Sequence, residues 1–305
     1  MQDDPNLAVS LARVQIVRYM NVCSMVLLVF DWTISLSEEV ALIWQSHWSV
    51  ANVLYLLSRY LPYIDTTLNV IFYLKPGIDT KTCLRNYTVS TWSTGLGMGI
   101  SELILMWRTY IIWEKSRKLM YTFCVLWILW IIGNGSLVVI FVKSLRFEPQ
   151  PLSIIPGCNL VDGSNVIFVS YASFLCMEIF LVIMTLIKGV PHIRNSHSPL
   201  IITLYRDGII FFICLACLSL GNVILLLTAP VEFLDLLNTP TRVLHTALCC
   251  RVVLHIRGVT MRRARGTRTT GPPRTAARPT TAIELTTLPA FDTSTYVRTV
   301  STGTT

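Results

Sequence analysis

Five ionisable side chains lie inside long apolar stretches of this sequence: Asp31, Arg59, Asp65, Glu102 and Glu178. A charged group is costly in hydrocarbon, so within such a stretch it must face other helices or water. Two interpretations stay open. The five residues form a polar site or relay inside a helical bundle, or they pair with one another, for example Arg59 with Asp31 or Glu102, and hold the helices in register.

Two of the nine cysteines, Cys83 and Cys158, lie between apolar stretches. If both face an oxidising compartment they can form a disulfide, which we predict; the alternative is two unpaired thiols. The sequence Asn86-Tyr87-Thr88 is a glycosylation sequon on the same side. Asn86 lies close to the predicted membrane edge, so its modification is a minor expectation.

Enzyme motifs are missing from the sequence. It has no His-Glu-x-x-His, Gly-x-Ser-x-Gly or phosphate-loop motif. Of the five histidines, only His245 and His255 lie in an apolar stretch, and their separation is not a metal-ligand spacing. A retinal Schiff base needs a lysine in the last span, and no lysine follows Lys188. We therefore expect no enzyme, metal or cofactor.

The apolar stretches that carry these residues are long enough to cross a membrane. The chain of 305 residues is 53% hydrophobic and 14% charged, with a mean hydropathy of +0.58. Crossing takes roughly 20 apolar residues. The pattern predicts spans at 19–36, 49–74, 87–113, 119–142, 166–188 and 204–228. A weaker seventh span within 231–256 completes an all-α bundle of seven transmembrane helices.

Basic residues near the ends of the spans predict the orientation. The N-terminus (1–18) is placed outside, together with Arg18 and Arg242. The seven-helix domain covers 19–257. Residues 258–305, rich in Thr, Arg and Pro, are predicted to be a disordered cytoplasmic tail. Five arginines near its start are expected to bind anionic lipids: Arg257, Arg262, Arg263, Arg265 and Arg268. Nucleic acid is not an expected partner.

The third predicted span has two further features. Gly95 and Gly99 form a small-xxx-small step, which predicts close approach of a neighbouring helix. Glu102 follows Gly99 by three residues and is therefore expected to point inward. Arg108, at the cytoplasmic end of this span, is the residue we expect to couple to a cytoplasmic signalling partner.

One segment resembles a known family. Residues 19–61 are similar to the N-terminal signature of uncharacterised multi-pass membrane proteins of mushroom-forming fungi. The likeness rests on an Asp, an acidic pair, two tryptophans and an Arg-Tyr-Leu: Asp31, Glu38, Glu39, Ile43, Trp44, Trp48 and Arg59 to Leu61. It continues in 102–113, 199–208 and 242–257. The resemblance implies a seven-helix protein whose domain has no assigned function.

The layout is also similar to that of G-protein-coupled receptors, without their rhodopsin-like motifs: no acidic residue directly precedes Arg108, and the last span lacks Asn-Pro-x-x-Tyr. Our leading hypothesis is a receptor-like sensor in the plasma membrane. The alternatives are a transporter or channel with a polar mid-membrane path, and a structural scaffold.

Overall fold

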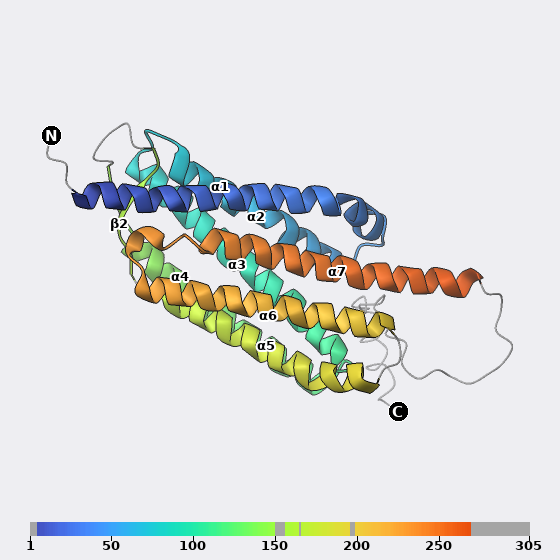
Figure 1. Cartoon of the computed structure of the whole chain (residues 1–305). Helices are drawn as coiled ribbons and strands as arrows, with labels where there is room; N and C mark the ends of the chain where they lie inside the picture. Colours follow the sequence, from blue (N-terminus) through green and yellow to red (C-terminus); the bar gives the residue numbers. More distant parts are fainter. Residues whose placement is uncertain (1–4, 150–155, 165, 196–198, 270–305) are drawn as a thin grey trace, which may run out of the picture.

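The computed structural model describes residues 5–149, 156–164, 166–195 and 199–269 (Figure 1). Within these ranges, the side chains of 5–8, 190–212, 231, 259, 260 and 262–269 are outside this description. Within it, seven α-helices form an all-α bundle: α1 (Pro5–Glu39), α2 (Val50–Leu74), α3 (Thr80–Ile112), α4 (Arg117–Ser144), α5 (Ile167–Asn195), α6 (Pro199–Thr228) and α7 (Asn238–Thr269). A π-helical turn, Val40–Trp44, follows α1, and a 3-10 turn, Val231–Phe233, precedes α7.

Each predicted span has its helix, but several helices run past the predicted limits. The largest differences are at the two ends. Helix α1 begins at Pro5, because proline is well tolerated in the first turn of a helix. Helix α7 ends at Thr269, whereas the sequence predicted the tail to begin at residue 258. Pro240 lies in its first turn, where proline is tolerated, and the next proline in the sequence is Pro272. Residues 270–305 lie outside the described residues, so disorder there stays a prediction.

Helix α7 has a central position in the bundle. It packs against α1, α2, α3 and α6, while α2 with α3 and α5 with α6 form the most extensive helix pairs. In Figure 1, α7 runs beside α1 on one side and α6 on the other. The start of α1 and strand β2 (Asn159–Asp162) lie at one end of the bundle, and the end of α7 lies at the other. We call these the disulfide end and the tail end.

The interior of the bundle contains many polar and charged side chains beside its apolar clusters, and its exterior exposes many large apolar side chains. Arg59, Glu102 and His245 are each 1% exposed or less. Val26, Phe30, Leu129 and Ile132, in contrast, are 61–63% exposed. Most of the buried charged side chains are paired, as buried charges usually are. By length and composition, two described helical segments, Arg117–Ser144 and Ile167–Gly189, are apolar and long enough to cross a membrane.

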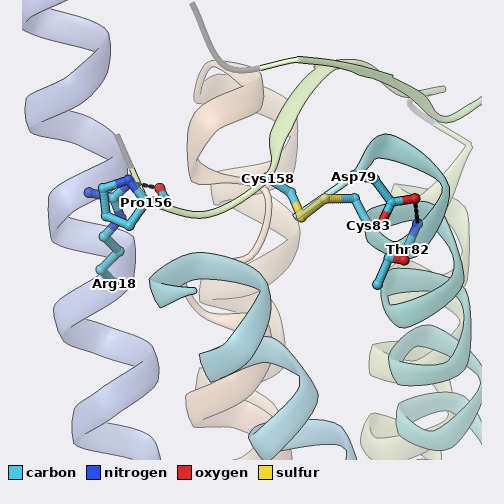
Figure 2. Close-up of a disulfide and its surroundings, with 6 residues drawn as sticks. All are labelled: Arg18, Asp79, Thr82, Cys83, Pro156 and Cys158. Carbon is cyan, nitrogen blue, oxygen red and sulfur yellow. Dashed lines mark hydrogen bonds between the residues drawn. A yellow bond between two sulfur atoms is a disulfide. The ribbon is translucent and has the colours of Figure 1, made fainter. Parts of the chain in front are cut away.

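The predicted disulfide is present: Cys83 bonds to Cys158, with Cα atoms 5.9 Å apart (Figure 2). Cys158 precedes β2, which pairs antiparallel with β1 (Arg146–Glu148). Cys83 lies in the first turn of α3, where Asp79 accepts a hydrogen bond from the Thr82 amide at 3.3 Å. That hydrogen bond holds the pKa of Asp79 below its usual value. The bond therefore joins the β-hairpin to the capped start of α3.

Backbone hydrogen bonds also hold the segment before β2 against α2. The Cys158 amide donates to the Phe72 carbonyl at 2.9 Å, and the Gly157 amide donates to the Lys75 carbonyl at 3.0 Å. Gly157 has a φ of +94°, and a Cβ there would lie 2.6 Å from the Tyr73 carbonyl oxygen. Arg18 of α1 donates to the Pro156 carbonyl at 2.5 Å, as Figure 2 shows. Arg18 is 8% exposed, so it is part of this contact and is not an outward-facing charge.

Replacing Cys83 with serine should destabilise the protein, because the disulfide closes a loop of 75 residues in sequence. Cross-links over such separations typically stabilise by about 2–4 kcal/mol. The measurement is thermal unfolding of the purified protein in detergent, with Cys23→Ser as the control, since Cys23 is exposed and unbonded. Equal melting temperatures for the two variants would show that hydrogen bonds alone hold the hairpin.

Candidate functional site: buried charge clusters and an aromatic cavity

Four charged residues near the tail end form one group, which we call the tail-end cluster: Asp31, Glu39, Arg59 and Arg251. The Arg59 guanidinium lies 2.5 Å from Asp31 Oδ2 and 3.5 Å from Glu39 Oε2. Arg251 of α7 contacts the other Asp31 oxygen at 2.9 Å. The cluster therefore joins α1, α2 and α7. It confirms the pairing of Asp31 with Arg59; Glu102 is not part of it.

Glu39 and Arg251 were not included among the intramembrane charges predicted from the sequence; Glu39 follows the predicted first span, which ended at residue 36. Its carboxylate is fully buried and accepts hydrogen bonds from the Tyr60 hydroxyl at 2.8 Å and the Trp44 indole at 3.1 Å. A signal was available in the spacing. Asp31, Ser35 and Glu39 are four residues apart, so they share one face of a continuous helix, and Ser35 also accepts a hydrogen bond from Arg59.

Asp65 forms a second buried pair, with Arg242 of α7, at 3.2 Å. Arg242, predicted on the outer side of the membrane, is 1% exposed and also donates to the Thr246 hydroxyl at 2.7 Å, so it is packed inside the bundle. Arg242 is buried because of its position in α7: the described helix runs from Asn238 without a break and directs this side chain at α2 and α3. Only the tertiary structure provides the partner for Asp65.

Glu102, Glu178 and His245 form a third group, the central cluster, from α3, α5 and α7. His245 Nε2 lies 3.1 Å from Glu178 Oε1, and each of the three residues is 1% exposed or less. Glu102 points inward as predicted. Neither of its carboxylate oxygens has a hydrogen-bond partner among the described residues. His245 was missed as a partner because nothing in its sequence spacing relates it to a glutamate on another helix.

A cavity of about 230 Å³ lies between α3, α4 and α5, toward the disulfide end. Its wall is mainly apolar and includes seven aromatic side chains: Tyr87, Trp92, Trp127, Trp130, Phe141, Tyr171 and Phe174. Gly95 and Gly135 also line it, and an added Cβ at either would meet no atom within 4 Å. Gly95 therefore does not support close helix packing, contrary to the prediction. Gly99 does, since Trp127 donates to its carbonyl at 3.2 Å.

Asp235 and Asn238 line the same cavity, where the chain enters α7. Asp235 accepts hydrogen bonds from the hydroxyls of Tyr73 at 2.9 Å and Tyr87 at 3.3 Å. Burial nevertheless raises the pKa of Asp235 above its usual value. A ligand in this cavity would thus meet a mainly apolar surface, with several aromatic side chains and a few polar groups, a composition typical of small-molecule sites.

The remaining predicted site residues have other positions. Arg108 is 7% exposed, so it is packed inside the bundle and does not project from the tail end. Arg257 donates to the Leu42 carbonyl at 3.1 Å and to the Ser46 hydroxyl at 3.2 Å, so it holds the connection between α1 and α2. Asn86 is half-buried within α3. The side chains of four predicted lipid-binding residues lie outside the described part: Arg262, Arg263, Arg265 and Arg268.

Comparison with known proteins finds one family. Residues 19–64 match the model of a family of unknown function (DUF6533). This match supports the part of the predicted resemblance that concerns a domain of unknown function. It covers Asp31, Glu39 and Arg59 of the tail-end cluster. No curated protein matches the chain.

Proposed function

We propose that this chain is an integral membrane protein with seven spans that acts as a receptor-like sensor for a small, mainly apolar molecule. The disulfide end faces the outside, because disulfides persist in oxidising compartments. The tail end then faces the cytoplasm, where the arginines after residue 256 satisfy the preference for positive charge on that side. The plasma membrane is the proposed location.

The distribution of side chains supports the membrane assignment. An apolar exterior over polar clusters is favourable only in contact with lipid, where hydrocarbon replaces water at the helix surfaces. Val26 and Phe30 on α1 and Leu129 and Ile132 on α4 give these helices exposed apolar faces. The helices in turn satisfy their own backbone hydrogen bonds, as a bilayer requires.

The aromatic cavity is the observation that supports the sensor. It lies at the disulfide end, near the hairpin that the disulfide and the Cys158 and Gly157 amides hold in place. Trp92, Leu96 and Ile131 line it and are also exposed on the outside of the bundle, so a ligand dissolved in the lipid would reach it between α3 and α4.

A transporter or channel remains the second candidate, and the positions of the charged residues count against it. The lining of the cavity includes none of the five residues that were expected to line a polar path. Asp31, Arg59, Asp65 and Glu178 are instead held in ion pairs or hydrogen bonds to partners on other helices. Such pairing favours a structural role for them.

The test is a screen of small phenols and aliphatic alcohols by thermal shift on the purified protein in detergent. A compound that binds in the cavity should stabilise the wild type and lose this effect in Gly135→Leu, whose side chain would fill the cavity. Gly133→Leu is the matched control on the same helix, because Gly133 has open space around it and does not line the cavity. The same loss in both variants, or no stabilising compound, would refute the cavity as a ligand site.

A second measurement separates sensing from simple binding. A fluorophore on Glu114→Cys, in the exposed connection between α3 and α4 at the tail end, should change its emission when a screened compound binds. Binding without this change contradicts the sensor, and uptake of the compound into liposomes would favour the transporter.

A further inference from the structure

The negative charges of the central cluster are not balanced by positive charges within the cluster. Two carboxylates, Glu102 and Glu178, and one imidazole, His245, converge from three helices, and their ligand atoms all lie within 4.8 Å of one another. No lysine or arginine among the described residues forms an ion pair with either glutamate. Buried ionised carboxylates require a counter-charge or a proton.

The hydrogen bonds point to a missing partner. Both oxygens of Glu102 and Oε2 of Glu178 are buried and have no partner in the described structure. The other charged clusters differ: the Asp31 oxygens contact Arg59 and Arg251, and Asp65 contacts Arg242. Since buried polar atoms are normally satisfied, three unpaired acceptors at one point indicate a ligand with positive charge.

We propose that Glu102, Glu178 and His245 bind a divalent transition-metal ion, with Zn²⁺ as the representative ion. A set of two carboxylates and one imidazole suits such ions better than Ca²⁺ or Mg²⁺, which prefer oxygen ligands alone. The ion would neutralise both carboxylates and cross-link α3, α5 and α7. No sequence spacing indicates this site, because each ligand comes from a different helix.

The imidazole is arranged as a metal ligand requires. His245 Nε2 faces Glu178 at 3.1 Å, while Nδ1 lies 3.6 Å from the Cys249 sulfur. A neutral imidazole can therefore donate from Nδ1 to the sulfur and present the Nε2 lone pair to the ion, and such an outer partner is usual for metal-binding histidines. Metal bonds of about 2.1 Å bring ligand atoms to roughly 3–4 Å separation. Glu102, which has no competing hydrogen bond, is the side chain that would close this distance.

The experiment measures metal on the full chain purified in detergent. After chelation and readdition of Zn²⁺, elemental analysis of the wild type should find about one tightly bound ion per chain. Glu102→Gln keeps the shape and removes the charge, and its affinity should fall by more than the roughly 10–100-fold that loss of an outer partner costs. Glu114→Gln is the control, because Glu114 is exposed and lies just after the end of α3, away from Glu102. This variant should bind Zn²⁺ like the wild type.

Co²⁺ provides a check that does not depend on the variants folding. Cobalt in the wild type should show visible absorption without the intense bands of thiolate coordination, since the proposed ligands are oxygen and nitrogen. Thiolate bands would assign the metal to cysteines and refute the proposal. Two further results would refute the proposal: less than half an equivalent of bound Zn²⁺ in the wild type, or unchanged Zn²⁺ affinity in a folded Glu102→Gln variant. In either case the two carboxylates would be neutralised by protons instead of a metal ion.

Discussion

Arg59→Met should destabilise the protein by about 3–5 kcal/mol, the usual cost of removing one partner from a buried ion pair. The arginine is 1% exposed and contacts Asp31 at 2.5 Å and Glu39 at 3.5 Å. Methionine occupies a similar volume but provides no charge and no donor. Glu39 would then keep only neutral hydrogen bonds, in an interior that solvates a carboxylate poorly.

The unfolding of this region can be followed through a buried thiol. Cys250 is fully buried beside Ile43, Tyr55 and Leu254, between the helices that the tail-end cluster joins. After the exposed cysteines have been blocked with a maleimide, the reaction of the buried thiols with a fluorogenic reagent reports thermal unfolding. Arg59→Met should lower the transition temperature strongly.

Arg251→Met is the matched control for this prediction. It removes a charge from the same aspartate, but the Arg251 side chain is 47% exposed, and Asp31 keeps its buried counter-charge, Arg59, at 2.5 Å. We therefore expect a clearly smaller loss of stability than for Arg59→Met. If both variants unfolded at the same temperature, burial would not be what makes the Arg59 contact important, and the structural account of the cluster would be wrong.

Gly97→Ala is expected to have the second large effect. A Cβ on Gly97 would lie 1.8 Å from Nη2 of Arg242, so the guanidinium must move. That group is 1% exposed and is held by Asp65 at 3.2 Å and by the Thr246 hydroxyl at 2.7 Å. Its displacement would leave Asp65 without its ion pair, and we expect a loss of roughly 3 kcal/mol or more.

Gly95→Ala, two residues earlier on the same helix, provides the comparison. Its added Cβ meets no atom within 4 Å. Alanine also has the higher helix propensity, by about 1 kcal/mol, so this variant should be as stable as the wild type or slightly more stable. Thermal unfolding of the two variants in the same detergent decides the matter. A stable Gly97→Ala would mean that Arg242 is not packed against α3.

The sequence alone determined the elements and one covalent contact. Apolar stretches of about 20 residues predicted where the seven helices lie. These stretches can be read from the sequence because the length of an apolar segment depends only on residues that are adjacent in the chain. Cys83 and Cys158 were the two cysteines outside those stretches, and their disulfide is confirmed. The pair of Asp31 with Arg59 was one of the alternatives that the sequence allowed.

Only the tertiary structure decided the other partners. Asp65 with Arg242 and Glu178 with His245 are contacts between side chains that are distant in sequence and on different helices. Their pairing depends on the rotation and tilt of each helix, which local periodicity does not encode. For the same reason Gly95, predicted to pack closely, lines a cavity instead. The sequence thus identified which polar residues must be inside, and the packing of α7 among its neighbours determined what each one contacts.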